Sequence, residues 1–131
     1  MKFLQKPKKS LGQNFLTDKN IIRKIVEIGK ISKKQTILEI GPGLGSLTQE
    51  IIEMNPKKII IVEKDQNLSE QLKNKLGNHN NIEIISDDIF NFLKQKNFTS
   101  EIIIFGNLPY NISTKIISSL ILLKKWPPWY K

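Results

Sequence analysis

Four short apolar runs recur along the chain, and each is nearly continuous rather than alternating with polar residues. They cover residues 36–40, 58–62, 82–85 and 102–106, and they are rich in isoleucine. Continuous β-branched runs are typical of parallel strands that are covered by helices on both faces. We therefore predict four parallel strands.

The segments between these runs carry apolar residues at helical spacing. Leu68, Leu72 and Leu76 repeat every four residues and stop at a glycine, a common residue after a helix. Residues 18–28 hold an isoleucine stripe that also stops at a glycine, and further helices are predicted over 47–54 and 112–123, but none between the third and fourth strands. The order indicates an α/β doubly wound parallel sheet, with its site at the carboxyl ends of the strands.

Composition excludes several classes of chemistry. The 131 residues include no cysteine and a single histidine, His79, which excludes thiolate nucleophiles, Ser-His pairs and zinc sites of the Cys/His type, so we expect no metal. No apolar run is long enough to cross a membrane, and the basic N-terminus lacks the features of a signal peptide. We therefore expect a cytoplasmic protein with no membrane partner.

The formal net charge of +9 is unevenly placed. Residues 1–34 carry a net +8, residues 35–110 a net −3 and residues 111–131 a net +4. A neutral-to-acidic middle between basic ends suggests a small-molecule site bordered by a surface for phosphates. Lysine-rich tails that are simply solvated explain the charge equally well.

A glycine-rich segment follows the first strand directly. Gly41, Gly43 and Gly45 form a Gly-x-Gly-x-Gly sequence that opens a helix, so the backbone can approach a ligand closely. The dinucleotide fingerprint needs its third glycine where this chain has Ser46, which disfavours a nicotinamide oxidoreductase. A tight strand-to-helix turn without a ligand is the simpler alternative.

Two acids stand where a ligand lying across the sheet would pass. Glu63 ends the second strand and could accept both hydroxyls of a ribose, while Asp88 follows the third strand and could accept from an adenine amino group. Either acid alone is more often an ordinary solvated residue at a strand end.

The most specific feature follows the fourth strand, where Asn107, Leu108, Pro109 and Tyr110 are consecutive. An adenine amine is a poor nucleophile, and neutral acceptors for both of its N–H bonds help to pyramidalise the nitrogen. The Asn107 side-chain oxygen and the Leu108 carbonyl can supply them, with Pro109 fixing the turn and Tyr110 offering a ring for stacking. The alternative is a proline turn with a buried tyrosine.

Three motifs together resemble one enzyme family. Residues 10–16 read SLGQNFL, residues 38–45 read LEIGPGLG and residues 107–113 read NLPYNIS, as in the ribosomal RNA adenine N6-dimethyltransferases. The resemblance is strongest to the small-subunit branch, with the large-subunit resistance branch as the alternative. It implies a Rossmann-like class I methyltransferase that uses S-adenosyl-L-methionine and dimethylates two adjacent adenines near the 3′ end of small-subunit ribosomal RNA. Ribosomal RNA and the small ribosomal subunit are the implied partners.

The resemblance also assigns roles to residues. By motif, Asn14 and Leu16 would close over the cofactor, and Gly41 would line its methionine part. Glu63 would hold the ribose, Asp88 the adenine, and Asn107 would bridge the cofactor and the target base. The resemblance divides the chain into a basic N-terminal segment and helix, 1–34, and a partial S-adenosylmethionine-binding methyltransferase domain, 35–131.

The chain stops one helix beyond the fourth strand, whereas family members continue with further strands and a helical domain. We therefore expect a truncated sheet, a free apolar edge at residues 102–106 and little turnover by this chain alone. A non-catalytic fragment that binds RNA or cofactor is the remaining alternative, and the sequence leaves the oligomeric state open.

Overall fold

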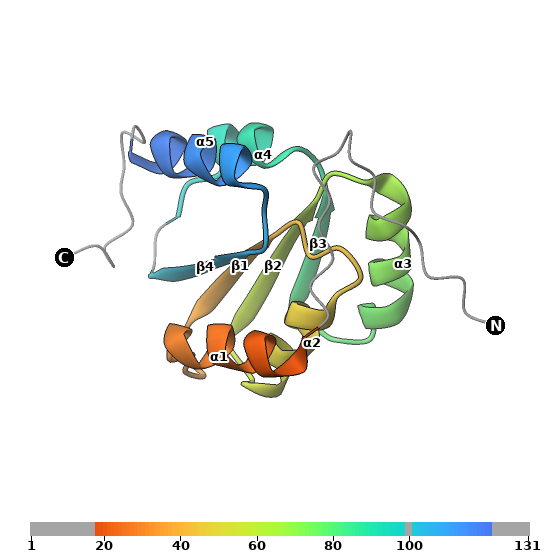
Figure 1. Cartoon of the computed structure of the whole chain (residues 1–131). Helices are drawn as coiled ribbons and strands as arrows, with labels where there is room; N and C mark the ends of the chain where they lie inside the picture. Colours follow the sequence, from red (N-terminus) through yellow and green to blue (C-terminus); the bar gives the residue numbers. More distant parts are fainter. Residues whose placement is uncertain (1–17, 99–100, 122–131) are drawn as a thin grey trace.

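The computed structural model describes residues 18–98 and 101–121. All four predicted strands are present and form one parallel sheet in the order β3-β2-β1-β4 (Figure 1). Their bounds are Thr36–Ile40 for β1, Lys58–Glu63 for β2, Ile82–Ser86 for β3 and Ile102–Gly106 for β4. In the register of the sheet, Ile37 of β1 pairs with Ile59 of β2 on one side and with Ile103 of β4 on the other. The predicted doubly wound α/β fold is confirmed.

Helices cover both faces of the sheet (Figure 1). One face packs against three helices, which are α1 (Lys19–Gly29), α2 (Ser46–Glu53) and α3 (Gln66–Leu76). The other face packs against α4 (Ile89–Gln95) and α5 (Tyr110–Ile121). Successive strand residues point to opposite faces, so Ile37 belongs to the first core and Leu38 to the second. This explains why the strands read as continuous apolar runs.

The expectation that no helix separates the third and fourth strands was wrong, because α4 lies between them. The helix has only seven residues, too few for a clear helical period. Its signals were local: Ile89, Phe92 and Leu93 share the buried face, and Asp88 caps the first turn. A parallel sheet also needs a crossover here, since β3 and β4 lie at opposite edges.

Helix α1 shows why its last residue is a glycine. Asp18 caps the first turn by accepting from two backbone N–H groups, and the helix ends at Gly29, where the sequence predicted. The left-handed residue is the next one, Lys30, with φ 48°. A Cβ on Gly29 would come within 2.4 Å of the ring of Phe105, so close packing against β4 requires the glycine.

Several expectations fall on residues outside the described part of the chain. These are the roles of Asn14 and Leu16 and the last residues of the helix predicted over 112–123. Within the described part, no helix is long and apolar enough to cross a membrane.

Candidate functional site

The loop after β1 is a tight turn built on three glycines. Gly41, Gly43 and Gly45 all have positive φ, at 62°, 59° and 87°, a conformation that other residues adopt only with strain. The N–H of Gly41 donates to the carbonyl of Val62 at 2.9 Å, which ties the loop to the end of β2. A Cβ on Gly41 would lie 2.9 Å from Cδ2 of Leu108. The loop therefore presents bare backbone at the carboxyl edge of the sheet.

Glu63, the last residue of β2, lies against this loop and is only 5% exposed. Its Oε2 accepts from the N–H of Gly43 at 3.2 Å, and its Oε1 accepts from the N–H of Asp65 at 2.9 Å. Burial raises the pKa of this carboxyl group, and the two backbone donors act in the opposite direction. Each carboxylate oxygen can accept more than one hydrogen bond, so Glu63 is held in place with acceptor capacity remaining.

The structure gives Asp88 a structural role as a helix cap, and its adenine role stays a prediction. Its Oδ1 accepts from the N–H of Phe90 at 2.8 Å, which makes it the N-cap of α4. Its Oδ2 lies 3.6 Å from Nζ of Lys64 in an ion pair. The neighbouring N–H of Asp87 donates to the carbonyl of Glu63 at 3.2 Å, so this acidic turn lies beside the end of β2.

The turn after β4 faces the glycine loop. Leu108 packs over both Gly41 and Gly106, because a Cβ added to either glycine would meet its side chain. The Leu108 carbonyl accepts a long hydrogen bond of 3.5 Å from the hydroxyl of Ser113. Asn107 lies half-buried in the same turn.

Helix α5 begins directly after this turn. The Pro109 carbonyl accepts from the N–H of Ser113 at 3.0 Å and from that of Ile112 at 3.1 Å, so the proline marks the start of the helix. Tyr110 is 89% exposed, which contradicts the alternative of a buried tyrosine. Its ring is open to a stacking partner.

Glu39 was given no role from the sequence, yet the structure places it in the same region. It is 1% exposed, and its Oε2 accepts from the hydroxyl of Thr48 at 2.6 Å. Its Oε1 is buried and has no hydrogen-bond partner among the described residues. Burial, opposed by the Thr48 hydrogen bond and reinforced by the negative charge of Glu63, raises the pKa of Glu39 to about 7. A glutamate within an otherwise apolar strand was the signal in the sequence.

The carboxyl edge thus brings together the glycine loop, Glu63, Glu39 and the 107–110 turn, with Asp88 beside β2. Among residues 18–98 and 101–121, no group of three or more His, Asp or Glu side chains could hold a metal ion.

Comparison with known proteins identifies the family. Residues 4–127 match the family model described as ribosomal RNA adenine dimethylase, which is almost the whole chain. The chain belongs to this family. The ribosomal RNA small subunit methyltransferase A of Pelagibacter ubique is 50% identical over 117 residues, which are 89% of this chain and 44% of the relative. The corresponding protein of a Sulfurihydrogenibium species is 43% identical over 114 residues, 86% of this chain and 44% of that protein.

Two solved structures of related enzymes share the fold. The 23S rRNA methyltransferase ErmE superposes with a TM-score of 0.73 at 31% identity, covering 85% of this chain and 44% of its own. A dimethyladenosine transferase from Plasmodium falciparum gives 0.72 at 28% identity, covering 87% and 40%. The chain therefore spans less than half the length of these relatives and contains their Rossmann-like core.

Proposed function

We propose that this chain is the cofactor-binding part of a ribosomal RNA adenine N6-dimethyltransferase that uses S-adenosyl-L-methionine. The observation that carries the proposal is Glu63, which is buried at the end of β2 and held on the glycine loop by the N–H of Gly43. This loop is itself in contact with the 107–110 turn through Leu108. The conclusion agrees with the family of the chain.

The residues at the carboxyl edge fit this cofactor. Bare backbone at Gly41 accommodates the methionine part, and the remaining acceptor capacity of Glu63 suits a ribose diol. The unpartnered Oε1 of Glu39 is a buried carboxylate oxygen that suits the cationic groups of the methionine part. Asp88 is proposed for the adenine, and Asn14 and Leu16 for covering the site. The cofactor supplies the methyl group.

The 107–110 turn is proposed to hold the target adenine. The side-chain oxygen of Asn107 and the carbonyl of Leu108 accept the two amine N–H bonds, which orients the nitrogen for attack. The long 3.5 Å contact from Ser113 leaves the Leu108 carbonyl free to accept a further hydrogen bond. The exposed ring of Tyr110 stacks on a base that has left its RNA stack. The nitrogen becomes acidic after methylation, so its proton can leave to water without a strong base.

The substrate proposed is small-subunit ribosomal RNA, at two adjacent adenines near its 3′ end. Two relatives at 50% and 43% identity are named as small-subunit enzymes, whereas the large-subunit enzyme ErmE is 31% identical. The higher identity favours the small-subunit branch.

Cofactor titration tests the first part of the proposal. S-adenosyl-L-methionine should bind and NAD should not, and Glu63→Ala should weaken binding about ten- to hundredfold, the scale for hydrogen bonds to a charged group. Glu70→Ala, on the exposed surface of α3, is the matched control and should leave the affinity unchanged. Equal affinity of the Glu63 variant and the wild type would exclude the ribose role.

Methyl transfer to small subunits that lack the modification tests the second part, in a polypeptide of the full family length. Asn107→Ala should lower the rate about a hundredfold, the usual scale for one oriented polar partner in a transition state, and should weaken cofactor binding much less than it lowers the rate. If wild-type protein binds cofactor and RNA but transfers no methyl group, the non-catalytic alternative holds. If methyl groups were transferred to large subunits instead, the chain would be assigned to the resistance branch.

A further inference from the structure

The opposite edge of the sheet carries a separate concentration of positive charge. Three helix-to-strand loops meet there, over residues 30–36, 54–58 and 77–81. Together they contain five lysines and one histidine but no aspartate or glutamate. All three loops precede parallel strands, so the fold places them at the amino edge of the sheet.

Backbone and amide contacts join these loops into one surface. The N–H of Lys57 donates to the carbonyl of Gln35 at 2.9 Å, which links the first loop to the second. The side-chain amide of Asn81 donates to the carbonyl of Pro56 at 3.1 Å, which links the second to the third. The lysines on these loops therefore have fixed backbone positions relative to one another.

Four of the lysines have no acidic partner. Among the described residues none of the four forms an ion pair, and all are exposed: Lys30, Lys33, Lys34 and Lys57. We call these four the amino-edge lysines. The fifth, Lys58, is paired with Glu83 at 2.7 Å. The charge of the amino-edge lysines is thus available to a partner outside the chain.

The turn that carries two of these lysines is well fixed. The N–H of Ser32 donates to Oε1 of Gln35 at 2.7 Å, and the N–H of Gln35 donates back to the carbonyl of Ser32 at 3.2 Å. These bonds close the turn and leave Lys33 and Lys34 at its tip. Binding a partner at these two lysines would therefore cost this loop little backbone entropy.

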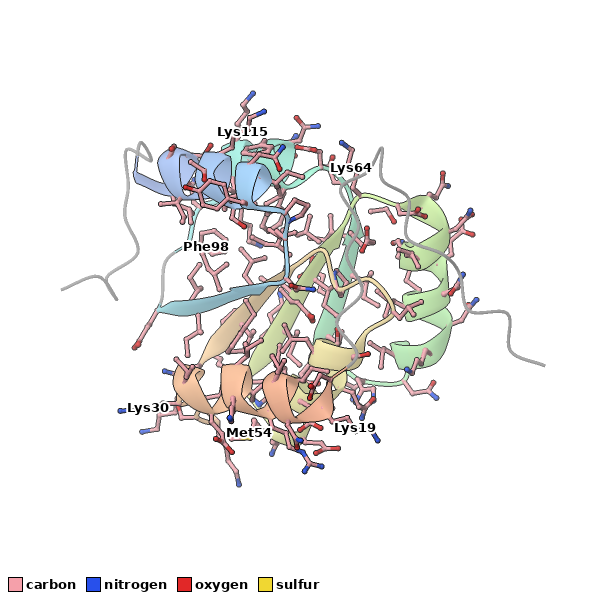
Figure 2. The ribbon with its side chains drawn as sticks, in the orientation of Figure 1. Lys19, Lys30, Met54, Lys64, Phe98 and Lys115 are labelled. Atoms are coloured by element: carbon pink, nitrogen blue, oxygen red, sulfur yellow. The ribbon has the colours of Figure 1, made fainter. Side chains whose placement is uncertain are left out.

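The carboxyl edge has the opposite charge. Besides the buried Glu39 it carries four further acids, which are Glu63, Asp65, Asp87 and Asp88, and its neighbouring lysine, Lys64, is paired with one of them. Figure 2 shows Lys30 and Lys64 on opposite sides of the molecule. A strand of five residues separates the two edges by roughly 16 Å, so a nucleotide at the carboxyl edge cannot bring its own phosphate to the amino edge.

We propose that the amino-edge lysines bind the phosphate backbone of RNA, at a surface separate from the target-adenine site. Lysines contact phosphates as point charges, and the exposed hydroxyl of Ser32 and the side-chain amides of Asn78 and Asn80 can bond to sugar and phosphate oxygens. The identity of the RNA as ribosomal rests on the proposed function. A second segment of the same RNA, distant from the target adenines, then binds the protein at the amino edge of the sheet.

The test is the salt dependence of binding to small-subunit ribosomal RNA, measured without cofactor by fluorescence anisotropy. The variant is Lys33→Gln, Lys34→Gln and Lys57→Gln together. If each lysine neutralises one phosphate, the slope of log affinity against log salt should decrease by about two units. The matched control removes the same charge from exposed lysines on helices α1, α3 and α4, as Lys24→Gln, Lys73→Gln and Lys94→Gln, and its slope should change by less than one unit.

Replacement of the same three loop lysines by arginine keeps the charge and should keep the wild-type slope, which separates charge from folding. Equal slope changes in the two glutamine triples would overturn the inference, because net charge alone would then explain the effect. Binding to anionic phosphatidylserine vesicles but not to RNA would overturn it too. Titration of S-adenosyl-L-methionine on the same variants should give wild-type affinity. If the wild type did not bind S-adenosyl-L-methionine, the proposed function would be rejected, but the result on RNA binding would still stand.

Discussion

Replacing Glu39 with glutamine should make the protein more stable at neutral pH but not at acidic pH. The side chain is 1% exposed, and burial raises its pKa from 4.5 to about 7. An unfolded chain loses this proton near pH 4.5, so between pH 4.5 and about 7 the folded state binds more protons than the unfolded state. The free energy of unfolding therefore falls as the pH rises through this window.

The shift sets the size of the effect. One pKa unit corresponds to about 1.4 kcal/mol, so Glu39 costs the folded state about 3 kcal/mol once the pH is above 7. Glutamine has no proton to lose and keeps an oxygen that can accept from Thr48. Below pH 5 the wild-type carboxyl group is neutral in the folded state, so wild type and variant should agree within about 1 kcal/mol.

Urea unfolding followed by far-ultraviolet circular dichroism, at constant ionic strength from pH 5 to 8, measures this difference. Burial also raises the pKa of Glu63, so part of the stability loss of both proteins above pH 4.5 belongs to Glu63, and the difference between them reports Glu39 together with its charge coupling to Glu63. Glu83→Gln is the control. The hydrogen bond from Lys58 lowers the pKa of Glu83, so its small contribution is lost only as the pH falls below 4.5, and this variant should differ from wild type by a constant amount from pH 5 to 8.

A difference between wild type and Glu39→Gln that stays constant from pH 5 to 8 would refute the reasoning, because no proton uptake would then be linked to Glu39. If the carboxylate serves a cationic ligand group, the stabilised variant should also bind S-adenosyl-L-methionine at least tenfold more weakly. A gain in stability together with a loss of affinity is expected when a buried charge serves binding at the expense of stability.

Three further variants test other contacts. Thr48→Val removes the hydrogen bond that lowers the pKa of Glu39, so the pH window of stability loss should begin at the same pH and extend to a higher pH in the same unfolding series. In a polypeptide of full family length, Tyr110→Phe should retain most of the methyl-transfer rate and Tyr110→Ala should lose most of it, since the exposed ring is proposed to stack; equal damage would reject stacking. Gly29→Ala should lower the free energy of unfolding by about 1–3 kcal/mol, because its Cβ would overlap the ring of Phe105, and an unchanged urea midpoint would contradict this packing.

The sequence by itself determined the elements whose signals are local and repeated. The four apolar runs became the four strands, and the leucines of α3, repeated every four residues, became its buried face. Backbone geometry also followed from local chemistry, since glycines spaced as Gly-x-Gly-x-Gly took positive φ. The sequence did not predict the short helix α4, because seven residues form only two turns, too few for a helical period to be recognised.

The tertiary structure decided which side chains meet and which are buried. Glu39 is one residue in an apolar strand until the sheet and α2 enclose it, and only that burial gives its carboxyl group a raised pKa. Tyr110 was open to either a buried or an exposed reading, and the start of α5 at the end of the sheet decided for exposure. The amino-edge lysines belong to separate stretches of sequence, and the parallel topology brings their loops together. Burial and proximity arise from contacts between distant segments, which no local pattern contains.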